Sequence, residues 1–196
     1  MTFPAIRTGI GYDVHAFAAG RDLVLGGIRI PHDRGLAGHS DADVLLHAMA
    51  DALLGAAGLG DIGQHFPPGD PTFAGADSLV LLVTAAGLVR ASGWTIGNID
   101  ATVIAEAPKV NPHVPEMRAA IGRALGLDGD AIGIKATTNE GMGFVGRGEG
   151  IAALAVATVY REAPASTQPP GEEGTLPPPP PGDQDSPPGG GSPCAS

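Results

Sequence analysis

The sequence predicts an α/β two-layer sandwich, with helices on one face of a mixed β-sheet. Two observations lead to this fold class. Segments whose apolar residues alternate, as in strands, interleave with segments whose apolar residues recur every three or four positions, as in helices. This pattern stops near residue 162, because residues 163–196 hold eleven of the nineteen prolines and almost no large apolar side chain. We therefore expect a folded domain over 1–162 and a disordered tail over 163–196, since the tail cannot bury enough surface to offset the entropy of ordering.

The first half of the domain is expected to contain a strand, a hairpin and a helix. Residues 6–15 alternate and predict a strand that ends at an aspartate and a histidine. Residues 23–30, LVLGGIRI, place two short apolar runs around two glycines, which is typical of a hairpin. Residues 41–57 have helical periodicity, and Ser40 with Asp43 three places later is close to a capping box at their start.

The second half continues the alternation of helices and strands. Residues 77–92 predict a helix that begins with an aspartate as N-cap and is more thoroughly buried than the first. Residues 98–107 and 131–138 predict strands, and residues 115–125 predict a helix between them that starts with proline and is ended by glycine. Residues 149–161 fit either element, but their β-branched spacing favours a strand. The far face of the sheet also carries apolar side chains, so we expect another subunit to cover it.

Composition excludes several classes of protein. The net charge is −10, and because the tail holds four carboxylates and no Lys or Arg, residues 1–162 carry −6 of it. Such a domain is a poor general binder of nucleic acid or anionic membranes. The one cysteine, Cys194, excludes a disulfide framework and a cysteine zinc site. No apolar run has the length of a membrane span and no signal peptide pattern opens the chain, so we expect a cytoplasmic protein.

The segment GYDVHAF, residues 11–17, places a carboxylate and an imidazole two positions apart in a strand. Side chains at this spacing point to the same face, so Asp13 and His15 could coordinate one metal ion together. The alternative is an aspartate that caps a turn beside a packed histidine. This segment alone leaves both interpretations open.

A second polar set lies in residues 39–51. Four side chains spaced four positions apart would lie along one side of a helix and its entry loop: His39, Asp43, His47 and Asp51. Two of the four are expected to be merely solvated. His47 borders the apolar helix face and is placed to be a third ligand, which gives zinc an O/N/N set with an open fourth position, as in catalytic sites. The helix N-terminus near Ser40 would also offer free N–H groups to a phosphate.

Two glycine-rich stretches remain. Residues 60–70 predict a loop between two helices, of a length that is often functional, and we regard His65 as a loop residue rather than a ligand. In residues 135–150 the polar group Thr137–Asn139 follows a strand, and Glu140 adds a hard oxygen ligand suited to Mg²⁺ or Mn²⁺. The glycines after Glu140 allow the backbone to approach a ligand or another subunit closely.

Four segments, in order and at the expected spacing, resemble the 2-C-methyl-D-erythritol 2,4-cyclodiphosphate synthase family of the non-mevalonate isoprenoid pathway. They read GYDVHAF, HSDADVLLHAMADALLGAAGLGDIGQHFP, APKVNPHVPEMR and KATTNEGMGFVGRGEGIA. The resemblance covers residues 5–161, the whole expected domain. Because four separate motifs agree, it is highly specific.

The resemblance implies a homotrimeric phosphorus–oxygen lyase, with sheets packed around a threefold axis and active sites between neighbouring subunits. The substrate would be 4-diphosphocytidyl-2-C-methyl-D-erythritol 2-phosphate, whose 2-phosphate attacks the β-phosphorus, expels CMP and closes a cyclic diphosphate. The family's zinc ligands match Asp13, His15 and His47. Its second divalent cation, Mg²⁺ or Mn²⁺, is bound through the position of Glu140, and its transition-state stabilisers match His39 and Thr138.

The resemblance also implies the substrate contacts. Asp61, Gly63 and the loop at Phe66 would hold the diol end. The cytidine pocket, from the adjacent subunit, would lie around 105–111 and 136–138. The full set of implied substrate-binding residues is Asp13, His15, His39, Ser40, Asp61, Ile62, Gly63, Phe66, Ala105, Pro108, Lys109, Ala136, Thr137, Thr138, Asn139, Glu140, Phe144 and Arg147.

Two further points concern Arg147 and the loop after Phe66. In the family, the region of Arg147 and Glu149 lines a central cavity that can hold an isoprenoid diphosphate; a purely structural ion pair is the alternative. The family usually has an acidic residue directly after the proline that follows Phe66, but this chain has Pro68 there. Asp70 is the carboxylate that could fold back in its place.

Two other functions remain as alternatives. Another zinc phosphoesterase on the same scaffold would use water, but the chain shows no obvious base beside the metal. A trimeric binding protein would hold an isoprenoid or a metal without turnover. The presence of His39, His47 and Thr138 favours the cyclase over a binding protein.

Overall fold

A five-stranded mixed sheet frames the domain in the computed structural model, which describes residues 4–67, 69–73 and 75–161. In sheet order its strands are β4 Gly35–Leu36, β1 Ala5–Ala18, β7 Gly150–Arg161, β5 Thr95–Ile104 and β6 Ile132–Thr137. The strands β5 and β6 are parallel, and every other neighbouring pair is antiparallel. A separate hairpin pairs β2 Leu23–Leu25 with β3 Ile28–Ile30. The predicted tail lies outside the described residues.

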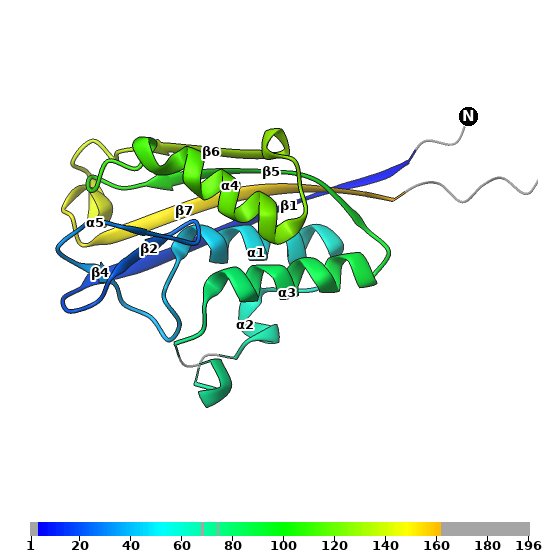
Figure 1. Ribbon diagram of the computed structural model, residues 1–196, viewed down its shortest axis with the longest axis horizontal. Helices are drawn as coiled ribbons and strands as arrows, with labels where there is room; N and C mark the ends of the chain where they lie inside the picture. Colours follow the sequence, from blue (N-terminus) through cyan, green and yellow to red (C-terminus); the bar gives the residue numbers. More distant parts are fainter. Residues whose placement is uncertain (1–3, 68, 74, 162–196) are drawn as a thin grey trace, which may run out of the picture. The chain divides into compact units, whose positions relative to one another are not determined.

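Three longer helices, α1 Val44–Ala57, α3 Ser78–Ala91 and α4 Val114–Leu125, pack together against the sheet (Figure 1). The short elements are α2 Ile62–His65, α5 Gly143–Gly146 and the 3₁₀ segments η1 Pro71–Phe73, η2 Asn111–His113 and η3 Gly129–Ala131. The predicted α/β sandwich with a mixed sheet is therefore confirmed. No helix in the described part of the chain is long and apolar enough to cross a membrane.

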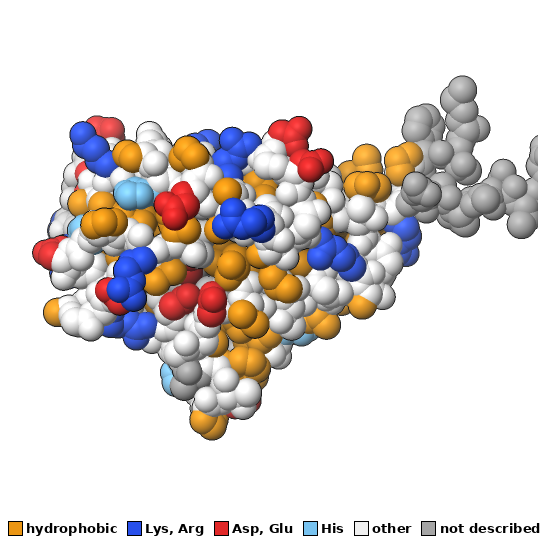
Figure 2. Space-filling model, viewed as in Figure 1, with side chains coloured by type: hydrophobic (Ala, Val, Ile, Leu, Met, Phe, Trp, Pro, Cys, Tyr) orange, Lys and Arg blue, Asp and Glu red, His pale blue; other side chains and the backbone are white. Residues whose placement is uncertain are grey.

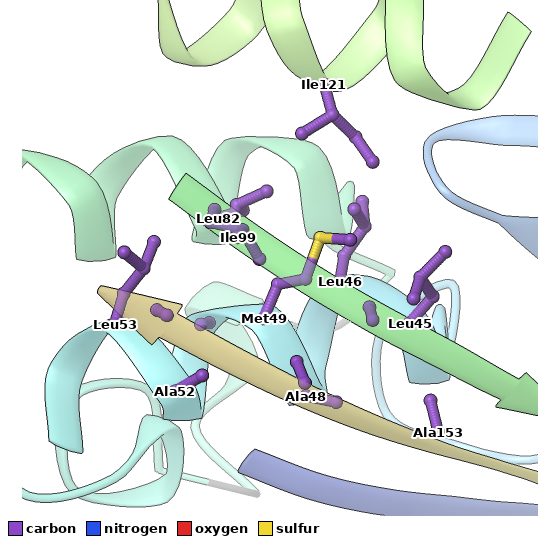
Figure 3. Close-up of a cluster of buried hydrophobic side chains, with 14 of the residues drawn as sticks. Leu45, Leu46, Ala48, Met49, Ala52, Leu53, Leu82, Ile99, Ile121 and Ala153 are labelled. Carbon is purple, nitrogen blue, oxygen red and sulfur yellow. The ribbon is translucent and has the colours of Figure 1, made fainter. Parts of the chain in front are cut away.

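Helix α1 is the centre of the core. It packs on β1 and β7 on one side and on α3 on the other. Figure 3 shows Met49 of α1 between Leu46 of the same helix and the side chains of Leu82 of α3 and Ile99 of β5, with Ile121 of α4 above them; Met49, Leu82, Ile99 and Ile121 are all fully buried. The core therefore holds α1 fixed relative to the sheet.

The approach of α1 to β1 depends on two glycines. A Cβ atom at Gly9 or Gly11 would collide with the α1 backbone, at the carbonyl oxygens of Ala52 and Ala48 respectively. Only a residue without a side chain fits such a contact. The alternation of β1 places Asp13 on the same face, two positions further along, so the close approach also carries that carboxylate toward α1.

The start of α1 differs from the prediction. The helix begins at Val44 with Asp43 as its N-cap, and not at residue 41 behind Ser40. The carboxylate of Asp43 accepts hydrogen bonds from the N–H groups of Leu45 and Leu46, and it also accepts one from Gly27 in the β2–β3 hairpin. Asp43 is thus completely buried, and its expected place in a solvated polar stripe is wrong.

Four other expectations need correction. Helix α1 is buried nearly all round, whereas α3 exposes Val80 and Val83, so the predicted order of burial is reversed. Strand β1 continues beyond the predicted end at His15 to Ala18. His65 lies in a short helix, α2, rather than in a loop. The glycine-rich stretch contains the unpredicted α5, while β7 is a strand as favoured.

The sheet face that points away from the helices remains apolar and exposed in the single chain. On β1 it presents Ile6, Ile10, Tyr12 and Val14, which are 41–71% exposed. Leu154, Val156 and Tyr160 continue this surface on the adjacent β7. On the face shown in Figure 2, by contrast, acidic and basic side chains of the described residues are interspersed.

Candidate metal centre and substrate cavities

Asp13, His15 and His47 come together where β1 passes the first turn of α1. Asp13 Oδ2 lies 3.0 Å from His15 Nε2 and 3.0 Å from His47 Nδ1, and the two histidine nitrogens are 3.2 Å apart. Among the residues that the structure describes, this is the one group of three or more such side chains close enough to share an ion. We refer to it as the tripod.

The dimensions of the tripod suit zinc. A tetrahedral zinc ion with bonds of about 2.0 Å separates its ligand atoms by about 3.3 Å, close to the three distances observed. One carboxylate oxygen and two imidazole nitrogens form a donor set that zinc accepts, and three protein ligands leave a fourth position for a substrate oxygen. The residues present therefore fit the metal that their spacing predicts.

The proton positions in the tripod also favour a cation. His15 Nδ1 lies 2.7 Å from the carbonyl oxygen of Ala37, which can only accept, so Nδ1 carries the proton and Nε2 is free as a ligand. Burial alone would raise the pKa of Asp13, but the hydrogen bonds and charges of His15 and His47 hold that pKa well below its usual range. Asp13 is therefore a carboxylate at neutral pH.

A cavity of about 210 Å³ opens beside the tripod. It is lined by His15, His39, Ser40, His47, Ile62, Gly63, Phe66, Pro67, Phe73 and Leu81. The structure thus brings together two tripod histidines, the predicted residue His39 and much of the predicted diol-binding segment. We call this space the tripod cavity.

The segment that borders the tripod cavity is organised by two aspartates. Asp61 caps α2 and accepts hydrogen bonds from the backbone N–H of Gln64 at 3.0 Å and from its side-chain amide at 2.8 Å. Asp70 accepts from the N–H of Thr72 at 2.9 Å and so caps η1 instead of folding back. Pro68, the departure from the family pattern, lies outside the described residues.

The expected phosphate site at the α1 N-terminus is not open. The carboxylate of Asp43 already accepts hydrogen bonds from the first free N–H groups of the helix. The loop before the helix is instead fixed by Arg21, whose guanidinium donates to the carbonyl oxygens of Gly38 and Ser40. No local pattern could have revealed Arg21, because its partners lie 17 and 19 positions away.

A second cavity, of about 410 Å³, lies beyond the carboxyl ends of β5 and β6. Its lining comes from two segments, and comprises Ala105, Glu106, Pro108, Lys109, Val110, Asn111, Pro112, Ala136, Thr137 and Thr138. These are the two segments predicted for cytidine, 105–111 and 136–138, with Pro112 as an addition. Glu106 accepts hydrogen bonds from the N–H groups of Asn139 and Gly141, at 3.0 and 3.1 Å, and so ties the two segments together.

The remaining predicted residues follow β6. Thr138 donates to the carboxylate of Glu140 at 3.1 Å, and Glu140 is held at a positive φ of 52°. Within the described ranges Glu140 does not join the tripod. Phe144 and Val145 belong to α5, and Arg147 pairs with Glu149 at 2.6 Å on the surface.

The YgbB family matches residues 6–160 of the chain. A curated relative from Bordetella avium, named 2-C-methyl-D-erythritol 2,4-cyclodiphosphate synthase, is 60% identical over 163 residues, which are 83% of this chain and 100% of the relative. The bifunctional IspDF of Campylobacter jejuni is 44% identical with a TM-score of 0.79, over 82% of this chain and 43% of that one. The Plasmodium falciparum IspF in complex with CDP is 31% identical with a TM-score of 0.72, over 83% of this chain and 100% of that one.

Proposed function

The chain belongs to the YgbB family, and we propose from this that it is a 2-C-methyl-D-erythritol 2,4-cyclodiphosphate synthase. It converts 4-diphosphocytidyl-2-C-methyl-D-erythritol 2-phosphate into 2-C-methyl-D-erythritol 2,4-cyclodiphosphate and releases CMP, a step of isoprenoid precursor biosynthesis. The observation that carries this proposal beyond the family name is the tripod, which borders a cavity that contains His39.

The reaction needs no nucleophile from the protein. An oxygen of the substrate's 2-phosphate forms a bond to the β-phosphorus, while the bond from that phosphorus to the oxygen bridging to the α-phosphate breaks. CMP leaves with the electron pair. Because both reacting groups belong to one molecule, the protein's task is to position them and to stabilise developing charge.

Asp13, His15 and His47 would hold a zinc ion, and Glu140 would contribute to a site for Mg²⁺ or Mn²⁺. When bound, such cations polarise phosphoryl oxygens and neutralise charge on the leaving group. They also account for the binding of a polyanion by a domain whose own charge is negative.

The chain's own residues supply orientation. His39 lines the tripod cavity and is positioned to donate a hydrogen bond to phosphate oxygens, while Ile62, Gly63 and Phe66 enclose the diol end. In the second cavity Lys109 provides a positive charge near the diphosphate, and Thr138 provides a hydroxyl. These donors would stabilise the transition state by placing positive charge and hydrogen-bond donors where negative charge develops on the phosphoryl oxygens.

We further propose a homotrimer. In it, one substrate would take its diol site from one chain and its cytidine site from a neighbour; among the described residues the two cavities have separate linings, which supports this division. The exposed apolar face of β1 and β7 supports such an assembly.

Arg147 and Glu149 would then lie near the threefold axis, where an isoprenoid diphosphate could bind Arg147; a structural ion pair alone is the alternative. A cytoplasmic location and a separate tail over 163–196 complete the proposal.

The test is to incubate the purified full chain with Zn²⁺, Mg²⁺ and the cytidyl substrate. We expect equal amounts of CMP and cyclic diphosphate, measured by chromatography and phosphorus NMR. Release of inorganic phosphate would indicate the phosphoesterase, and binding without turnover would indicate the binding protein. His39→Ala should lose most activity, whereas His32→Ala, outside both cavities, should retain it.

A further inference from the structure

On the side away from Asp13 and His15, His47 contacts Ser78, and Ser78 contacts Asp41. Neither Ser78 nor Asp41 has a role in the proposed reaction. Its Nε2 lies 2.9 Å from the hydroxyl oxygen of Ser78, the first residue of α3. The Ser78 hydroxyl in turn donates to Asp41 Oδ1, and the Ser78 backbone N–H donates to Asp41 Oδ2 at 3.1 Å. Ser78 is only 1% exposed, so water does not compete for these hydrogen bonds.

The direction of each hydrogen bond follows from the chemistry of the groups. A carboxylate only accepts, so the single hydroxyl proton of Ser78 is committed to Asp41. In its hydrogen bond with His47, the Ser78 oxygen can then act only as the acceptor. This requires the proton of His47 to be on Nε2. With Nε2 protonated, Nδ1 has a free lone pair, and Nδ1 is the atom that faces Asp13 and His15.

We propose that Ser78 and Asp41 are positioning residues for the metal ligand His47. This proposal rests on the metal site of the proposed function. They hold the His47 ring in the tautomer and the orientation in which Nδ1 can bind the ion. Such outer partners of ligating histidines typically change metal affinity by roughly 10–100-fold. The arrangement complements that of His15, where a backbone carbonyl performs the same task.

Ser40 is the other hydroxyl near His47, but it is a weaker candidate for this role. Its oxygen lies 3.3 Å from His47 Nε2 and already accepts a hydrogen bond from the N–H of Ala42 at 3.0 Å. It makes no hydrogen bond to a carboxylate within the described residues that would fix the direction of its own proton. Ser78 is both closer and fixed by Asp41.

Two substitutions test the proposal. Ser78→Ala removes the acceptor of the His47 proton. Asp41→Asn keeps the shape but replaces one of two oxygens that accept from Ser78 and from the Asp43 N–H, and it removes the carboxylate charge. The Ser78 proton is then no longer committed to residue 41 and can turn toward His47 Nε2, which favours the tautomer that cannot bind metal through Nδ1. Ser92→Ala is the matched control, because Ser92 caps the other end of the same helix and, within the described residues, its hydroxyl donates only to the carbonyl of Val89.

The primary measurement is the zinc dissociation constant of each full-length protein, by competition with a chromophoric chelator. We expect Ser78→Ala and Asp41→Asn to weaken zinc binding by roughly 10–100-fold and Ser92→Ala to leave it unchanged. Circular dichroism of the zinc-free proteins shows whether each variant folds. Should Ser78→Ala not fold, Asp41→Asn, which alters no buried volume, decides the matter.

Further readouts separate positioning from a direct role. In zinc-loaded wild type, nitrogen NMR of the imidazoles should show His47 protonated at Nε2, and excess zinc should restore CMP release by Ser78→Ala. Unchanged zinc affinity in both variants, or an inactive Ser78→Ala at full zinc occupancy, would overturn the positioning role and leave the cyclase intact. A wild type that binds no zinc would instead overturn the metal site on which both rest.

Discussion

The two faces of β1 differ in what completes them. On the face toward α1, Gly9 and Gly11 fit against the helix backbone and Asp13 and His15 meet His47, so every partner belongs to the same chain. On the opposite face, residues such as Ile10, 71% exposed, are covered by no other part of the chain that the structure describes. One strand therefore contributes ligands to a metal site within its own chain on one side and an exposed apolar surface on the other. Substitutions on the two faces can thus test packing within the chain and the proposed assembly separately.

The largest expected effect comes from adding a side chain at the tight contact between β1 and the α1 backbone. Gly11→Val would force a branched side chain into the backbone of α1 at Ala48, and since neither backbone can move without disrupting the core, we expect a loss of at least about 4 kcal/mol of unfolding free energy. Urea unfolding followed by circular dichroism measures it. Gly87→Ala is the control, because a Cβ atom there meets nothing within 4 Å; it should be neutral or slightly stabilising. Equal midpoints for Gly11→Val and wild type would contradict the packing argument.

The second effect removes the metal but keeps the strand. His47→Ala deletes one of three ligands while leaving the apolar contacts of α1 in place, so we expect most bound zinc and nearly all CMP release to be lost. The oligomeric state should not change, since His47 is on the inner face. Elemental analysis and light scattering provide the two measurements. Full zinc occupancy in the purified variant would show that the ligand assignment is wrong.

The third effect belongs to the outer face. Ile10→Lys places a charge where the proposed trimer would bury an apolar side chain, so we expect subunit association to weaken by about 100-fold or more while each chain still binds zinc. Analytical ultracentrifugation measures the association. Val80→Lys on α3, where the native residue is 60% exposed, serves as the control and should leave association unchanged. A wild type that is monomeric at all concentrations would refute the assembly.

The smallest effect concerns the pH dependence of stability. Burial raises the pKa of Asp43 to about 6, although backbone N–H groups oppose the shift. The folded protein therefore binds this proton more tightly than the unfolded chain, and ionisation costs stability as the pH rises from about 4 to 6. Relative to Asp43→Asn, zinc-free wild type should lose about 1–3 kcal/mol of unfolding free energy across this window. A pH-independent difference between the two proteins would contradict it.

Local patterns were sufficient for most of the fold. The caps Asp77 and Gly126 depend on neighbours in sequence and were predicted correctly, and the bounds of β7 were predicted to within a residue. The bounds of the other strands were less exact: β1 continues three residues beyond its predicted end, and β5, predicted over 98–107, spans Thr95–Ile104. The start of α1 was not, because Ser40 and Asp43 are both good N-caps and the choice depends on a hydrogen bond from Gly27 in the distant hairpin.

The same distinction holds for the site. Asp13 and His15 share a face because of strand geometry, and the pair alone left a metal site and a turn cap both open; His47 on the next helix favoured the metal. Ser78 lies 31 positions from His47, in a helix whose approach is set by packing, so no spacing rule could link them. Residues that meet across elements are found only once those elements are placed.

The pairing of β1 with β7 has a consequence for how the chain can change. It runs without interruption from Ala5 opposite Arg161 to Ala16 opposite Gly150, whereas the pairing of β5 with β7 is irregular between Ile96 and Asn98. A one-residue insertion or deletion between Tyr12 and Asp13 would reverse the alternation on one side of that point relative to the other. If residues 5–12 kept their register, the carboxylate of Asp13 and the imidazole of His15 would turn outward, away from His47. The length of this strand is therefore constrained as tightly as the identity of its inward residues: a substitution on the outward face changes one position, whereas an added or lost residue reverses the face of every residue on one side of it.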